Sequence, residues 1–220
     1  MNAHRGQDGL LSPDLVLHRA AERLAHQFTG TVNEETVERV VFESYTALAR
    51  TAAVTTHLPT VAEKFARDRL TALAQSRGLI AKPVPEILYV CVQNSGRSQM
   101  AAAITRHLAG EKVHVRSAGS HPAAGLLPGV VTVLEEAGID VADEFPKPLT
   151  DDVVRAADAV VTMGCGDACP LYPGKRYLDW QLNDPADLDL DGIRAVRDEI
   201  QQHVEQLLTE LTPSVPAARS

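Results

Sequence analysis

The sequence predicts an α/β protein in which a parallel sheet, covered by helices on both faces, follows a small three-helix bundle. Two patterns support this fold class. Up to residue 78, apolar residues recur at steps of three or four, as they do in amphipathic helices. After residue 85, short apolar runs alternate with helical segments, which is typical of a parallel sheet in an α/β protein.

The helical part is expected to span residues 1–82. Each of its three predicted helices has a single apolar stripe, and a bundle is the simplest arrangement that buries all three stripes. Gly30 and Gly78 suit helix ends, because glycine readily adopts the left-handed conformation that terminates helices. Each helix start is marked by a pair of residues typical of that position, namely Ser12 with Pro13, Thr31 with Glu34, and Thr60 with Glu63.

The segment Lys82–Pro85 marks a change of structure, because its two prolines disfavour both helix and strand. We therefore expect one domain at residues 1–82 and another at 83–213, followed by an unstructured tail at 214–220. The second domain should contain strands at 86–90, 113–115, 158–163 and 175–180. Its helices are expected at 98–108, 128–137, 150–156 and 191–211.

Composition and charge limit the classes of function. The formal net charge of −8 opposes binding to nucleic acid and to anionic membranes, so we expect neither as a partner. No apolar stretch approaches the roughly 18 residues of a membrane span and no signal peptide is visible, which predicts a soluble cytoplasmic protein. The three cysteines, Cys91, Cys165 and Cys169, suit a reducing compartment better than a disulfide framework.

The clearest chemical signal is the segment Cys91–Ser98, with the sequence CVQNSGRS, between a predicted strand and a predicted helix. Backbone N–H groups of such a loop, together with the positive end of the helix dipole, bind a tetrahedral oxyanion. Arg97 can donate two hydrogen bonds to that anion, and Ser98 can donate one to the Cys91 sulfur, which favours a nucleophilic thiolate. The residues expected to bind the substrate are Val92, Gln93, Asn94, Ser95, Gly96 and Arg97.

With this loop, residues Glu86 to Leu211 resemble the low-molecular-weight protein tyrosine phosphatases and the arsenate reductases built on the same fold. The resemblance also rests on Ser117–Gly119, expected as a turn after the second strand, and on Asn183–Pro185 after the last strand. It implies a phosphatase-like parallel sheet, and it implies that Asp184 is the general acid that protonates the departing oxygen. Considered alone, Asp184 would be a turn aspartate before a proline.

Cys165 and Cys169 favour a reductase over a phosphatase, because the reductases of this family carry two further thiols in the same region. Phosphatases of the family usually have aromatic residues after the Asp-Pro pair, whereas Ala186 and Asp187 follow it here. Gly96 occupies a loop position where the phosphatases often have a second cysteine. The sequence therefore predicts an arsenate reductase that acts on arsenate without a cofactor.

The expected mechanism is a relay of three cysteines. Cys91 attacks arsenate, Cys165 displaces arsenite by forming a disulfide with Cys91, and Cys169 then resolves that disulfide. Thioredoxin or a similar dithiol protein would reduce the final Cys165–Cys169 disulfide. These two cysteines are four positions apart and lie on one side of their segment, within disulfide range, if that segment is helical. Their spacing is shorter than in the best-known thioredoxin-coupled reductases, which leaves the reductant undecided.

Two other roles for the cysteines compete with this relay. A zinc site at Cys165 and Cys169 lacks two nearby ligands, since no histidine occurs between His121 and His203, and we expect no metal. A purely structural Cys91 would require the strand, the loop spacing and the helix to coincide by chance.

Two other functions are compatible with the sequence. A phosphatase for phosphotyrosine or small phosphate esters would use Cys91, Arg97 and Asp184 but not the other two cysteines. A binding protein that responds to oxyanions or metals would use the bundle to signal to a partner. The reductant, the oligomeric state and the role of the bundle do not follow from the sequence.

Overall fold

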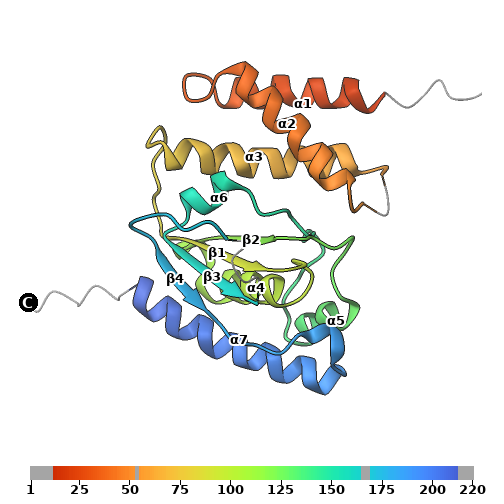
Figure 1. The fold of residues 1–220 in the computed structure, drawn as a ribbon, viewed down its shortest axis with the longest axis vertical. Helices are drawn as coiled ribbons and strands as arrows, with labels where there is room; N and C mark the ends of the chain where they lie inside the picture. The colour runs from red at the N-terminus through yellow and green to blue at the C-terminus, as the bar shows by residue number, and fades with distance from the viewer. Residues whose placement is uncertain (1–11, 53–54, 165–168, 213–220) are drawn as a thin grey trace, which may run out of the picture.

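The computed structural model describes residues 12–52, 55–164 and 169–212. Its N-terminal part contains the three predicted helices, α1 (Pro13–Gln27), α2 (Glu34–Ala49) and α3 (Leu58–Ser76). They lie together on one side of the sheet (Figure 1), and their apolar stripes form a single buried cluster. Residues at the centre of this cluster include Leu17, Val37, Val41 and Leu70.

The start of α1 agrees with the prediction, but the start of α2 does not. Ser12 precedes α1, and its hydroxyl accepts a hydrogen bond from the Leu15 N–H at 3.3 Å. The capping box predicted at Thr31 is wrong, because Asn33 caps α2 and accepts from the Thr36 N–H at 2.9 Å. Asparagine is at least as strong an N-cap as threonine, so the later residue prevails.

Helix α3 begins before the predicted position. The capping box at Thr60 is wrong, since the helix starts at Leu58 and Thr60 lies within its first turn. Pro59 fits this first turn, because its missing N–H would have no helical partner there in any case. Glu63, the predicted capping partner, instead forms an ion pair with Arg23 of α1 at 2.6 Å. That ion pair links two helices of the bundle.

The second part of the described chain contains a four-stranded parallel sheet in the order β2-β1-β3-β4. The strands are β1 (Glu86–Cys91), β2 (His114–Gly119), β3 (Ala159–Met163) and β4 (Arg176–Asp179). One face is covered by α4 (Arg97–Ala109), α5 (Pro128–Glu136) and α7 (Leu190–Leu211). Helix α6 (Asp151–Ala156) lies on the other face, between the sheet and α3 (Figure 1). The predicted fold class is confirmed.

Strand β2 is longer than predicted. Ser117–Gly119, expected as a turn, continue the strand and pair with the last three residues of β1. These small residues lack the β-branched side chains that indicate a strand, but the covered sheet favours them because they fit between packed layers. As a result Gly119 lies opposite Cys91, and β2 reaches the loop that follows β1.

Two ion pairs join the bundle to α6 and to the sheet. Arg69 of α3 pairs with Asp152 of α6 at 3.1 Å, and Arg116 of β2 pairs with Asp68 of α3 at 3.0 Å. The domain boundary between residues 82 and 83 stays a prediction, and the predicted tail at 214–220 lies outside the described residues. Within the ranges that the structure describes, no helix is both long and apolar enough to cross a membrane.

Candidate active site

The loop from Cys91 to Arg97 follows β1, one of the two central strands of the sheet. Cys91 is the last residue of β1 and is 3% exposed. Asn94 adopts the left-handed backbone conformation, with a φ of 49°, and its N–H donates to the Cys91 sulfur at 3.1 Å. The loop therefore wraps around the sulfur, and α4 begins at Arg97.

The Ser98 hydroxyl is oriented towards the Cys91 sulfur by its neighbours. The side-chain oxygen of Asn94 accepts from the backbone N–H of Lys147 at 2.8 Å and from Gln99 Nε2 at 3.1 Å. The amide nitrogen of Asn94 must therefore face Ser98 Oγ, to which it donates at 2.8 Å. Ser98 thus accepts from Asn94 and can direct its own hydrogen at the Cys91 sulfur, 3.0 Å away. Two hydrogen-bond donors therefore point at the Cys91 sulfur.

The carbonyl groups of the loop are held by the segment after β2. Backbone N–H groups of Ser120, His121, Ala123 and Leu127 donate to the carbonyls of Cys91, Val92, Gln93 and Ser95 at 2.8–3.2 Å. Among the described residues, the N–H groups of Ser95 and Gly96 have no acceptor. Because the carbonyls are engaged elsewhere, the loop can offer its N–H groups to an oxyanion.

Two glycines permit close packing around the loop. A Cβ atom on Gly119 would lie 2.7 Å from the carbonyl oxygen of Val92 and 2.9 Å from the nitrogen of Asn94. A Cβ atom on Gly96 would lie 2.7 Å from the ring of Pro185. Gly119 was expected in a turn, so the sequence did not reveal its close contact with the loop.

The predicted anion ligand and the predicted acid are in direct contact. Arg97 Nη2 lies 2.6 Å from Oδ2 of Asp184, and Nη1 donates to the Leu182 carbonyl at 3.3 Å. The side chain of Arg97 is 12% exposed and that of Asp184 is 46% exposed. The other carboxylate oxygen of Asp184 accepts from the Ala186 N–H at 3.1 Å. The structure therefore places Asp184 at the loop arginine, on the solvent side.

The three predicted relay cysteines are placed unequally. Cys91 lies beside the end of β3, and a Cβ atom on the next residue of that chain segment, Gly164, would lie 3.2 Å from Arg97 Nη1. Cys165 lies outside the described residues, and so does the predicted helical turn between it and Cys169. Cys169 is 7% exposed and packs in the cluster between the sheet and α6, on the face opposite to Cys91.

Residues 143–148, which we call the bridging segment, contact the loop although no motif predicts this. Gln99, which is completely buried, donates both to the Asn94 side chain and to the Phe145 carbonyl at 3.0 Å. Burial lowers the pKa of Lys147 in this segment, although the neighbouring Glu144 opposes the shift. Its sequence, DEFPKP, is typical of an ordinary loop, so only the three-dimensional contacts reveal its role.

Known protein families match both parts of the chain. Residues 86–217 match the low molecular weight phosphotyrosine protein phosphatases, and residues 17–74 match the N-terminal domain of protein-tyrosine-phosphatase-like proteins. The chain belongs to the low molecular weight phosphotyrosine protein phosphatase family. The predicted resemblance is therefore confirmed.

Several relatives of this phosphatase-family protein are arsenate reductases. It is similar to a solved thioredoxin-dependent arsenate reductase of Corynebacterium glutamicum, with 49% identity and a TM-score of 0.81 over 90% of this chain and 96% of that one. It is 36% identical over 123 residues to arsenate reductase 1 of Staphylococcus epidermidis, covering 54% of this chain and 92% of the relative. An arginine phosphatase of Geobacillus stearothermophilus is 27% identical, with a TM-score of 0.51 over 58% of this chain and 92% of that one.

Proposed function

We propose that this member of the phosphatase family is an arsenate reductase, which converts arsenate to arsenite with Cys91 as nucleophile. The observation that carries the proposal is the pair of donors, the Asn94 N–H and the Ser98 hydroxyl, at the Cys91 sulfur inside an anion-binding loop. The similarity along most of the chain to the C. glutamicum arsenate reductase supports reduction over hydrolysis.

The proposed first step joins Cys91 to arsenic. The N–H groups of the loop and the Arg97 guanidinium hold arsenate while the Cys91 thiolate attacks the arsenic atom. One arsenic–oxygen bond breaks, and Asp184 in its protonated form gives a proton to the departing oxygen, which leaves as water. Because Arg97 is paired with Asp184 at 2.6 Å without substrate, arsenate competes with this carboxylate for the guanidinium.

The proposed second step reduces arsenic. Cys165 attacks the sulfur of the Cys91 adduct, and the electron pair of the broken sulfur–arsenic bond stays on arsenic, which leaves as arsenite. Two thiols are thereby oxidised to the Cys91–Cys165 disulfide, and Cys169 then attacks Cys165 to release Cys91. Gly164, which precedes Cys165 in the sequence, lies beside Arg97, and this supports Cys165 as the thiol that attacks first.

The last steps of the relay need a rearrangement and a reductant. Cys169 packs on the face of the sheet opposite to Cys91, so we propose that Cys169 leaves this position to attack Cys165 after the first disulfide forms. We propose a dithiol protein of the thioredoxin type as the reductant of the Cys165–Cys169 disulfide. The thioredoxin dependence of the C. glutamicum relative supports this choice.

Hydrolysis of a phosphate ester is the second candidate function. The same loop would hold a phosphoryl group, and the G. stearothermophilus structure with this fold is an arginine phosphatase. Against this, the chain has Ala186 and Asp187 where an aromatic phosphate ester would need flanking rings.

One paired assay tests the proposed function. Arsenite release is measured with thioredoxin, thioredoxin reductase and NADPH, beside hydrolysis of a phenyl phosphate ester, with Cys91→Ser as the inactive control for both. We expect sustained arsenite release and feeble hydrolysis. Rapid hydrolysis without arsenite release would show a phosphatase instead, and an active Cys91→Ser protein would exclude Cys91 as the nucleophile of either reaction.

A further inference from the structure

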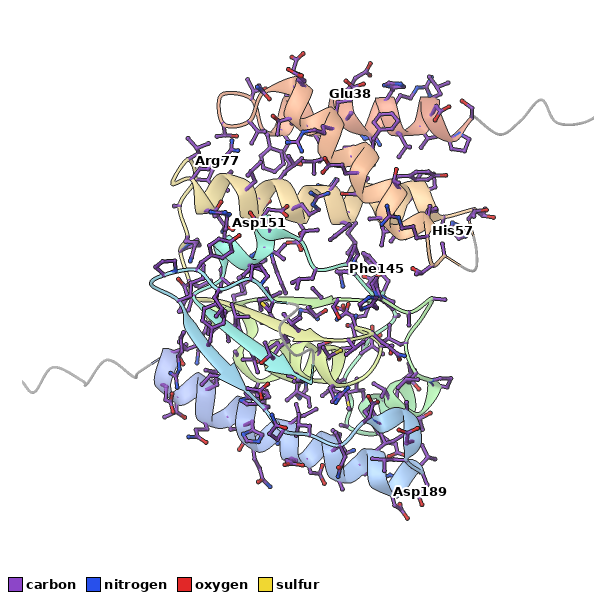
Figure 2. The ribbon with its side chains drawn as sticks, in the orientation of Figure 1. Glu38, His57, Arg77, Phe145, Asp151 and Asp189 are labelled. Atoms are coloured by element: carbon purple, nitrogen blue, oxygen red, sulfur yellow. The ribbon has the colours of Figure 1, made fainter. Side chains whose placement is uncertain are left out.

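The bridging segment connects the bundle to the active-site loop, and Phe145 is its main apolar contact with the bundle. Lys64 of α3 also donates to the Asp143 carbonyl at 3.2 Å. The Phe145 ring packs against the apolar cluster of the bundle, and Figure 2 shows the labelled residue between α3 and the sheet. Together with Leu48, Leu58 and Val61 of the bundle, Phe145 lines a cavity of about 230 Å³. The ring therefore packs on the bundle although its backbone belongs to the other part of the protein, where Lys147 Nζ lies 4.3 Å from the ring centroid.

The main chain of the same segment is hydrogen-bonded to the loop and its support. The Phe145 carbonyl accepts from Gln99 Nε2 at 3.0 Å, and the Lys147 N–H donates to the Asn94 side-chain oxygen at 2.8 Å. The Lys147 carbonyl accepts from the Gly119 N–H at 2.8 Å. A displacement of the segment would therefore move the partners of the Asn94 amide.

The orientation of that amide determines the hydrogen bonding of the nucleophile. Asn94 donates through its side-chain nitrogen to Ser98 only while its oxygen faces Lys147 and Gln99. Ser98 in turn can donate to Cys91 because it accepts from Asn94. Each link is a buried or part-buried polar contact, so a misplaced partner leaves a donor or acceptor unsatisfied.

We propose that the N-terminal bundle positions the hydrogen-bond network of Cys91, and that Phe145 is the positioning residue through which it acts. The inference rests on the proposed function only in taking Cys91 as the nucleophile. The ion pairs of Arg69 with Asp152 and of Arg116 with Asp68 attach the bundle to α6 and β2. Phe145 adds a contact whose other end is the Asn94 amide.

The test measures the reactivity of the Cys91 sulfur directly, in the full chain and without arsenate. In a background with Cys165→Ser and Cys169→Ser, only Cys91 can be alkylated by iodoacetamide, and the thiolate is the reactive form. Loss of the oriented Ser98 donor should therefore slow the reaction of the Cys91 sulfur at pH 6. We expect Phe145→Ala to slow alkylation about five- to tenfold at pH 6, and less than twofold at pH 10, where the thiol is ionised in any case.

Phe42→Ala is the matched control. Phe42 of α2 packs against the same apolar cluster and is also half-buried, but its ring contacts His18 at 5.0 Å between centroids and not the bridging segment. Phe42→Ala should lower the melting temperature and leave the ratio of alkylation rates at pH 6 and pH 10 unchanged. An equal fall of this ratio in both variants would overturn the proposal, because any loosening of the bundle would then reduce the reactivity of Cys91, whether or not Phe145 is involved.

A double-mutant cycle with Asn94→Ala tests the route. If Phe145 acts through the Asn94 amide, Phe145→Ala should slow alkylation at pH 6 no further once Asn94 is alanine. Additive effects, or an unchanged rate in a folded Phe145→Ala protein, would overturn the proposal. If Phe145→Ala does not fold, Phe145→Leu and Phe42→Leu replace the two alanine variants. We then expect the same contrast in the ratio of alkylation rates, with a smaller fold-change.

Discussion

Arg97 and Asp184 form an ion pair of 2.6 Å between Nη2 and Oδ2. In the proposed mechanism both residues act on the same oxyanion, Arg97 as its ligand and Asp184 as the acid for its departing oxygen. The substrate therefore has to replace one partner of an existing pair. Once the anion has displaced the carboxylate from the guanidinium, Asp184 lies beside the anion, where it can take up a proton and pass it to the departing oxygen.

This arrangement predicts a specific effect of Asp184→Asn. Turnover should fall by about 10²–10⁴, the usual contribution of a general acid. Arsenate should bind at least as tightly, because a neutral amide competes less well for Arg97 than a carboxylate does. Arsenite release gives the turnover, and calorimetry in a Cys91→Ser background gives the affinity.

The control is Asp187→Asn, which makes the same change of charge three residues away and should keep normal turnover. Lost affinity with normal turnover would make Asp184 a structural residue.

Gly119→Ala should damage the loop through a steric clash. The new methyl group would lie 2.7 Å from the Val92 carbonyl oxygen, and backbone atoms on both sides would have to shift. We expect a loss of about 1–3 kcal/mol of stability, as for other overpacked sites, and a more than tenfold loss of turnover. Gly125→Ala is the control, because a Cβ atom there meets nothing within 4 Å. Equal behaviour of the two variants in thermal unfolding and arsenite release would contradict the close packing.

His114 should make the fold sensitive to acid. Burial, together with the charge of Arg116, lowers the pKa of His114 to about 4. The pKa of a histidine in an unfolded chain is about 6.5. Between these values the unfolded state binds more protons, so stability falls as the pH falls. Because the side chain is 44% exposed, we expect an effect of no more than about 1 kcal/mol.

The check on His114 is a comparison of thermal unfolding at pH 7 and pH 4.5. His114→Asn should lose less stability over this interval than the unsubstituted protein, while the exposed control His107→Asn should lose the same amount. Burial also raises the pKa of the neighbouring Glu86, which stays in all three proteins, so the difference between them isolates His114. Identical losses in all three would exclude His114 as a source of acid sensitivity.

The features that the sequence predicts well are local. Cys91, Arg97 and Ser98 lie within eight positions of each other, and one short motif therefore indicates the nucleophile, the anion ligand and the hydroxyl. The spacing of apolar residues in helices and strands is also a local pattern, and it predicts the layers of the fold. The start of α2 was misplaced because two neighbouring capping residues, Thr31 and Asn33, competed for it.

The features that the sequence does not predict join distant segments. The Lys147 N–H reaches Asn94 across 53 positions, and Phe145 is drawn into a bundle that ends before residue 80. No sequence motif indicates either contact. A backbone N–H group is the same in nearly every residue type, and a single phenylalanine can pack in many places. Cys169 illustrates the same limit, since its packing behind the sheet follows from tertiary contacts alone.

The most direct test of the proposed relay is a single-turnover measurement on Cys169→Ser. The relay needs Cys169 only to resolve the Cys91–Cys165 disulfide, after arsenite has left. Pre-reduced Cys169→Ser mixed with excess arsenate should therefore release about one equivalent of arsenite and stop, and peptide mapping should find Cys91 joined to Cys165. Cys165→Ser should stop before release. Repeated turnover of Cys169→Ser with thioredoxin at the rate of the unsubstituted protein would contradict the relay.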